Sequence, residues 1–142
     1  MTSALNDVRW KRLLGFWFLL FVINYGASFV MFSAWFVTKQ PLLLVGAQLL
    51  SPLAFLFFGW LYFKKLEVNT WSVRLTTIVA WIGLSLGASM VLVGPVYGYA
   101  WQSVINTGII GGQSLNVAAM LVAGFAAASH KKRVDQPEGL EI

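Results

Sequence analysis

The side chains that could do chemistry inside this chain are uncharged amides and hydroxyls set in long apolar stretches. They recur in pairs at a spacing of three or four residues, which aligns side chains on one face of a helix. Such groups can hydrogen-bond a small neutral solute, or they can bond one another between helices. The pairs lie at comparable depths in their apolar stretches: Asn24 with Ser28, Gln48 with Ser51, Ser85 with Ser89, and Gln113 with Asn116.

These pairs predict a polar layer midway through a membrane domain. A carboxamide that faces lipid without a partner is costly, so we predict that these groups point inward and contact one another. The simpler interpretation is that they form interhelical hydrogen bonds that hold a bundle together. The alternative is a polar cavity that binds or conducts a small neutral solute. Conduction would then require an oligomer, because four helices enclose little pore.

The residues that the chain lacks argue against most enzyme chemistry. It has no cysteine and a single histidine, His130, so thiolate nucleophiles and cysteine-based metal sites are excluded. It shows no paired carboxylates, no phosphate-binding loop and no metal-ligand cluster. We therefore expect no enzymatic activity, no cofactor and no metal. A stripe of aromatic residues along 17–35 could line a groove for a ring-shaped ligand, but packing is the simpler interpretation.

The distribution of charge shows which elements must position the polar layer. Of the 142 residues, 58% are hydrophobic and 11% are charged. Three long runs of the sequence carry no formal charge. They contain 26 residues between Arg12 and Lys39, 24 between Lys39 and Lys64, and 56 between Arg74 and Lys131. A bilayer core of about 30 Å needs about 20 apolar residues per helix. The first two runs each fit one span, and the third fits two spans and a turn.

The sequence thus predicts an all-α integral membrane protein with four transmembrane helices in an antiparallel, up-down-up-down bundle. The expected spans are about 13–37, 42–63, 72–93 and 103–127, within a transmembrane domain over 13–129. A cytoplasmic segment over 1–12 precedes this domain, and a polar, disordered cytoplasmic tail over 130–142 follows it. The first span is expected to stay uncleaved, although the small residues at 26–28 leave a signal peptide as an alternative.

The basic residues predict the orientation. Only Lys39 falls on one side of the predicted spans, whereas nine cationic residues fall on the other. This bias places both termini in the cytoplasm of a multi-pass plasma membrane protein. The same residues would contact anionic headgroups, and no basic face suited to nucleic acid is present. The nine are Arg9, Lys11, Arg12, Lys64, Lys65, Arg74, Lys131, Lys132 and Arg133.

Glycines and one proline suggest how the helices pack. Gly83 and Gly87 form one GxxxG pattern, and Gly108 and Gly112 form another. Such patterns let two helix backbones approach closely. We expect the third and fourth helices to pack as a hairpin through them, with a homo-oligomer contact as the alternative. Pro52 removes a backbone hydrogen bond near the middle of the second helix, so a kink is expected there.

Three classes of function remain open from the sequence. The first is a non-catalytic subunit or scaffold that contacts membrane lipids and membrane-protein partners or further copies of itself. The second is an oligomeric channel or carrier for a small neutral solute, because no charged group lies inside the apolar runs to couple protons or ions. The third is a holin-like protein that permeabilises the membrane.

Overall fold

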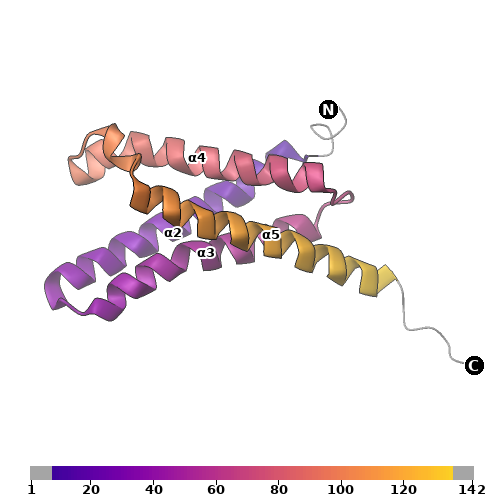
Figure 1. Ribbon diagram of the computed structural model, residues 1–142, viewed down its shortest axis with the longest axis horizontal. Helices are drawn as coiled ribbons and strands as arrows, with labels where there is room; N and C mark the ends of the chain where they lie inside the picture. Colours follow the sequence, from indigo (N-terminus) through magenta and orange to yellow (C-terminus); the bar gives the residue numbers. More distant parts are fainter. Residues whose placement is uncertain (1–7, 136–142) are drawn as a thin grey trace, which may run out of the picture.

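The structure is a computed structural model that describes residues 8–135, apart from the side chains at 107 and 108. Within this range it is helical, without strands (Figure 1). A short 3-10 helix, η1, precedes the last of four long helices. The elements are α2 (Trp10–Thr38), α3 (Pro41–Lys64), α4 (Trp71–Tyr97), η1 (Trp101–Val104) and α5 (Thr107–Asp135).

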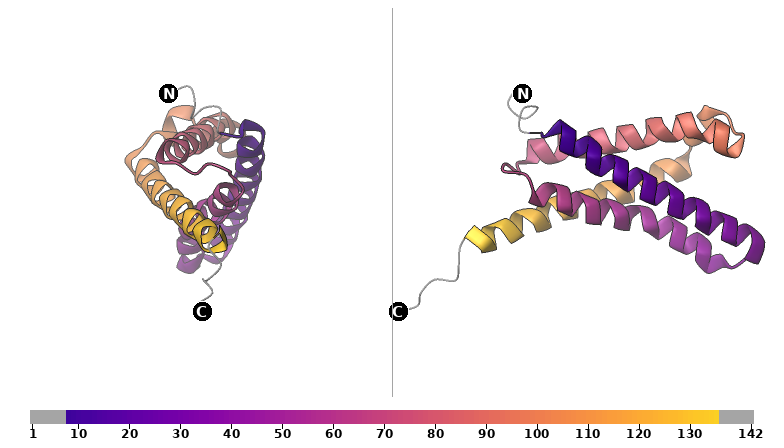
Figure 2. Two further views of the ribbon diagram at one scale, coloured as in Figure 1. Left: turned by 90° about the vertical axis from the view of Figure 1, so that its right-hand side faces the viewer. Right: turned by 180° about the vertical axis from the view of Figure 1, so that it is seen from behind.

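Successive long helices run in alternating directions, as predicted. The start of α2, the α3–α4 connection and the end of α5 lie at one end of the molecule, which we call the basic end (Figure 1). The α2–α3 turn and η1 lie at the opposite end. Seen from behind, α4 diverges from the α2–α3 hairpin toward that opposite end (Figure 2). The α2–α3 hairpin and α4 are therefore close together near the basic end and apart at the other, while the end of α5 projects beyond the basic end (Figure 1).

All four long helices are long and apolar enough to cross a membrane. The 24 residues of α3, the shortest, extend about 36 Å. Only 11–22% of the residues in the most apolar window of each helix are buried within the chain. Large apolar side chains instead cover the outside, and Val37 is 82% exposed. Lipid tails solvate an apolar surface of this kind. The chain is accordingly a small multi-pass membrane protein.

The core forms around α3, which packs mainly against α5 and α2. Tyr62 of α3 is fully buried, and its ring centroid lies 5.8 Å from that of Trp81 in α4 and 6.2 Å from that of Phe16 in α2. Phe55 lies two turns before Tyr62 on the same face of α3, and its ring centroid is 6.3 Å from that of Trp81. These edge-on and tilted contacts are the preferred geometry of aromatic pairs. The aromatic core thus joins three helices in the half of the bundle near the basic end.

Two helix ends differ from the predicted spans. α4 continues through Pro95 and ends where Gly98 adopts a left-handed backbone with φ 71°, its N–H bonded to Gly94 O at 2.8 Å. α5 starts only at Thr107, because the Asn106 side chain accepts a hydrogen bond from Ile109 N at 3.0 Å. Sequence patterning assigned Asn106 to the inside of the span, whereas the structure uses it as a cap.

The predicted disorder after residue 129 is wrong for the first residues of that tail. α5 continues to Asp135, so the basic residues at 131–133 form its last turns. Cations are stabilising at a helix C-terminus, where the carbonyl groups carry partial negative charge. Residues 136–142 lie outside the described residues, and so does most of the predicted segment 1–12.

The predicted glycine packing between α4 and α5 does not form at the three of these glycines whose surroundings the structure describes. A Cβ atom added at Gly83, Gly87 or Gly112 would meet nothing within 4 Å, and the surroundings of Gly108 lie outside the described part. The close approach occurs instead between α3 and α5. A Cβ at Gly59 would lie 2.6 Å from Met120 Sδ and 3.2 Å from Ala123 Cβ. The role of the α4 and α5 glycines in a homo-oligomer stays a prediction.

We predict that Gly59→Leu destabilises the bundle by about 1–3 kcal/mol, the usual cost of inserting methylenes into a packed core. Gly83→Leu, the matched control, should change stability much less because its surroundings are open. Unfolding in mixed detergent micelles, followed by circular dichroism, measures both. Equal losses in the two variants would contradict the packing described here.

Candidate functional site

A chain of side-chain hydrogen bonds crosses the middle of the bundle. Asn24 of α2 donates from Nδ2 to Ser51 Oγ of α3 at 3.3 Å. Ser51 Oγ in turn donates to Asn116 Oδ1 of α5 at 3.1 Å, and Asn116 Nδ2 donates to Gln113 Oε1 at 3.0 Å. We call these four residues the polar network. It brings together, from three helices, four residues of the predicted polar layer.

Asn116 is the centre of the polar network. It is 3% exposed and uses its amide as acceptor on one side and donor on the other. Asn24 is less completely paired, because its Oδ1 is buried and has no hydrogen-bond partner in the described residues. The network therefore provides hydrogen bonds to both ends of the Asn116 amide, whereas the Asn24 carbonyl oxygen stays buried and unpaired.

The remaining predicted polar residues are distributed differently. Ser85 of α4 is buried and accepts a hydrogen bond from Trp17 Nε1 of α2 at 3.0 Å, apart from the network. Ser28 is half-buried, and no described hydrogen bond joins it to the network. Gln48 is exposed, and its side chain likewise makes no described hydrogen bond. The sequence did not identify Trp17 as a donor, because its aromatic spacing on α2 resembles ordinary packing.

Gln48 borders a groove between α3 and α5 beside the polar network. This α3–α5 groove has a volume of about 390 Å³ and combines polar and apolar walls. Pro52 lies inside the continuous helix α3 and forms part of the wall beside Ser51. The main walls are Gln48, Ser51 and Pro52 of α3 and Gly111, Gly112 and Gln113 of α5. The groove exposes carboxamides at a depth where lipid offers them no hydrogen bond.

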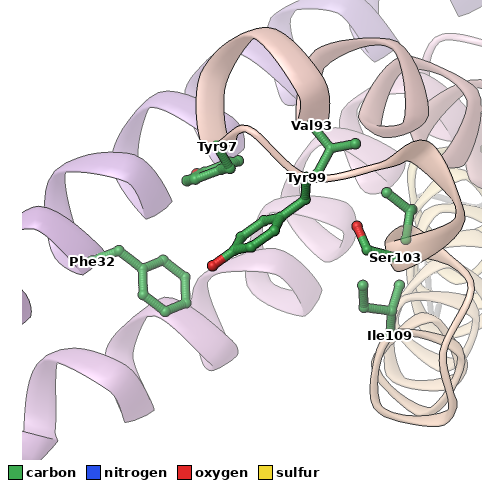
Figure 3. A pocket seen from close by; sticks show the side chains of 7 residues that line it. Phe32, Val93, Tyr97, Tyr99, Ser103 and Ile109 are labelled. Atoms are coloured by element: carbon green, nitrogen blue, oxygen red, sulfur yellow. The ribbon is translucent and has the colours of Figure 1, made fainter.

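A second, apolar pocket of about 470 Å³ opens at the end opposite the basic end. Figure 3 shows the Tyr99 ring between Phe32 of α2 on one side and Ser103 and Ile109 on the other, with Tyr97 close by. Tyr97 also contacts the rings of Phe29 and Tyr25 at 6.4 Å. The diverging helices are thus bridged by aromatic rings.

The α3–α4 connection ties the basic end together. Glu67 forms an ion pair with Arg9, and its backbone carbonyl accepts a hydrogen bond from Lys131 Nζ at 2.8 Å. Arg12 Nη1 donates to Lys65 O at 3.1 Å. The start of α2 and the end of α5 therefore both attach to this connection, which the sequence showed only as a polar loop.

Comparisons of the chain with protein-family models, with curated proteins and with solved structures find no match. The polar network and the α3–α5 groove are therefore the features of the molecule that bear on its function. Both lie within the predicted membrane spans, and neither includes a charged side chain.

We predict that Asn116→Leu destabilises the protein by about 1–3 kcal/mol, because it removes two side-chain hydrogen bonds in the membrane and leaves Gln113 without its donor. Ser114→Leu is the matched control on the same helix, since Ser114 is exposed and bonds only the backbone of its own helix. Detergent-titrated unfolding measures both variants. An Asn116→Leu protein as stable as the control would show that the network is energetically unimportant.

Proposed function

We propose that this protein is a non-catalytic membrane subunit or scaffold that associates with a second copy of itself through the α3–α5 groove. The observation that carries this proposal is the exposed, unbonded side chain of Gln48 beside the groove. An unsatisfied amide in hydrocarbon is costly, so a partner that bonds it is strongly favoured. A second copy supplies such a partner.

The residues that line the groove support a helix of another copy as its occupant. A glutamine side chain is both donor and acceptor, so two copies of Gln48 can bond each other across a two-fold axis. Gly111 and Gly112 form the opposite wall, and a Cβ added at either position would meet nothing within the chain. Small residues of this kind permit close approach of a neighbouring membrane helix.

We further propose that both termini face the cytoplasm, in the plasma membrane. Nine of the ten basic residues belong to the basic end, and Lys39 alone lies at the other. Basic residues in short flanking segments are retained on the cytoplasmic side during insertion. Contacts of these residues with anionic lipid headgroups follow from the same distribution.

Cysteine cross-linking tests the proposed association, because the chain has no native cysteine. We expect Gln48→Cys to form a disulfide-linked dimer in oxidised membranes. Val91→Cys is the matched control, since it lies on α4 at a similar distance from its helix end and is 73% exposed. Gln48→Leu should also weaken dimerisation about tenfold, in line with amide hydrogen bonds between membrane helices. Equal cross-linking at both positions, or a monomeric native mass in mild detergent, would contradict the proposal.

A channel or carrier for a small neutral solute is the second candidate, because the α3–α5 groove offers amide donors and acceptors to such a solute. The holin-like alternative has no comparable support from a particular site. Liposome flux separates these functions. Transport would be favoured if liposomes with the protein take up a neutral solute such as glycerol. This uptake would have to be lost in a Gln113→Leu protein that is still folded. Leakage of large dyes would favour a holin. We expect neither, and flux equal to that of protein-free liposomes.

A further inference from the structure

A buried cation at the basic end is left without an anion. Arg74, in the first turn of α4, is 6% exposed, although the sequence grouped it with the basic residues at the membrane surface. Its guanidinium donates from Nε to Asn69 Oδ1 at 2.7 Å and from Nη2 to Asn69 O at 3.2 Å. Both acceptors are neutral, and the only ion pair among residues 8–135 joins Arg9 to Glu67.

Two helices, α4 and α5, and the α3–α4 connection enclose this side chain. Its aliphatic part lies on Gly124 of α5, where an added Cβ would come within 2.9 Å of Arg74 Cδ. The guanidinium carbon lies 4.7 Å from the ring centre of Phe125 and 5.7 Å from that of Trp71. Asn69 completes the enclosure by donating from Nδ2 to Gly124 O at 3.1 Å. The site is therefore formed by α4, α5 and the α3–α4 connection, and Arg74 is not a flexible surface residue.

The positive charge of Arg74 in this enclosure would be stabilised by an anion. A buried charge is stable only when it is paired, and neutral carbonyl groups and ring faces compensate it incompletely. The first turn of a helix carries the partial positive charge of the macrodipole, so the position of Arg74 in α4 further disfavours its own positive charge. The Nη1 group makes no described hydrogen bond, and it is not among the fully buried unpaired atoms, so it keeps some accessible surface.

We infer that Arg74 is a binding site for the phosphate of an anionic phospholipid. A guanidinium matches phosphate oxygens in geometry and charge. Trp71 and Phe125 are both partly exposed beside it, as aromatic residues at the headgroup level of a bilayer are. Lys131, which bonds the same α3–α4 connection, adds positive charge nearby. The site is separate from the α3–α5 groove and does not depend on self-association.

The test compares protein in maltoside micelles without phosphate before and after addition of phosphatidylglycerol, phosphatidylcholine or inorganic phosphate. Native mass spectrometry counts bound lipid, and thermal unfolding reports the stabilisation. We expect one tightly retained phosphatidylglycerol and an affinity about tenfold lower in Arg74→Gln, the loss typical of a hydrogen bond to a charged group. Lys132→Gln is the control, because it removes one exposed charge from the same end. Equal losses in both variants would overturn the inference.

A second variant covers the case in which Arg74→Gln does not fold. Asn69→Asp preserves side-chain size and supplies a carboxylate to Arg74 from within the chain, although it removes the hydrogen bond from Asn69 Nδ2 to Gly124 O. It should fold and lose the retained phosphatidylglycerol, whereas wild-type affinity in this variant would overturn the inference. Stabilisation of the wild type by inorganic phosphate to the same degree would identify a free phosphate ion as the ligand and overturn the lipid assignment.

Discussion

The arrangement of the helices depends on the hydroxyl of Ser51. It accepts a hydrogen bond from α2 and donates one to α5, so a single oxygen atom joins three helices at the depth where water is absent. This requirement places α3 between α2 and α5, and the aromatic core around Tyr62 then fills the half of the bundle nearer the basic end. α4 does not take part in the network. It is held by aromatic contacts, by the Trp17–Ser85 hydrogen bond and by the connection that precedes it.

The two ends of the bundle are consequently unlike. At the basic end, Glu67 and Asn69 bind side chains or backbone from α2, α4 and α5, and they hold the helices together with charged and polar contacts. At the other end α4 diverges, and aromatic rings bridge the space (Figure 2). Charged contacts are feasible at the basic end because headgroups and water are close to it. The amides of the α3–α5 groove lie farther from water, which is why an unbonded Gln48 has consequences that an unbonded surface lysine does not.

The number of helices and their alternation could be predicted from periodicity, and contact among polar residues at one depth from the cost of unpaired amides in lipid. The particular partners, Asn24 with Ser51 and Ser51 with Asn116, could not. The glycines could not be assigned correctly from their spacing. GxxxG reports only that close approach is permitted, and the structure uses the isolated Gly59 instead. The burial of Arg74 was equally invisible in the sequence, because it results from a contact with Gly124, fifty positions later in the chain.

The hydrogen bonds of the polar network differ in the sequence distance that they span. Asn24 and Ser51 are 27 positions apart and belong to consecutive helices, so they can bond as soon as the first hairpin has been synthesised. Asn116 is 65 positions from Ser51 and belongs to the last helix. Until that helix enters the bilayer, the Ser51 hydroxyl lacks its acceptor, and Gly59 lacks the Met120 side chain that packs against it. The hydrogen bonds that join α2, α3 and α5 are therefore complete only once α5 lies beside α3 in the bilayer.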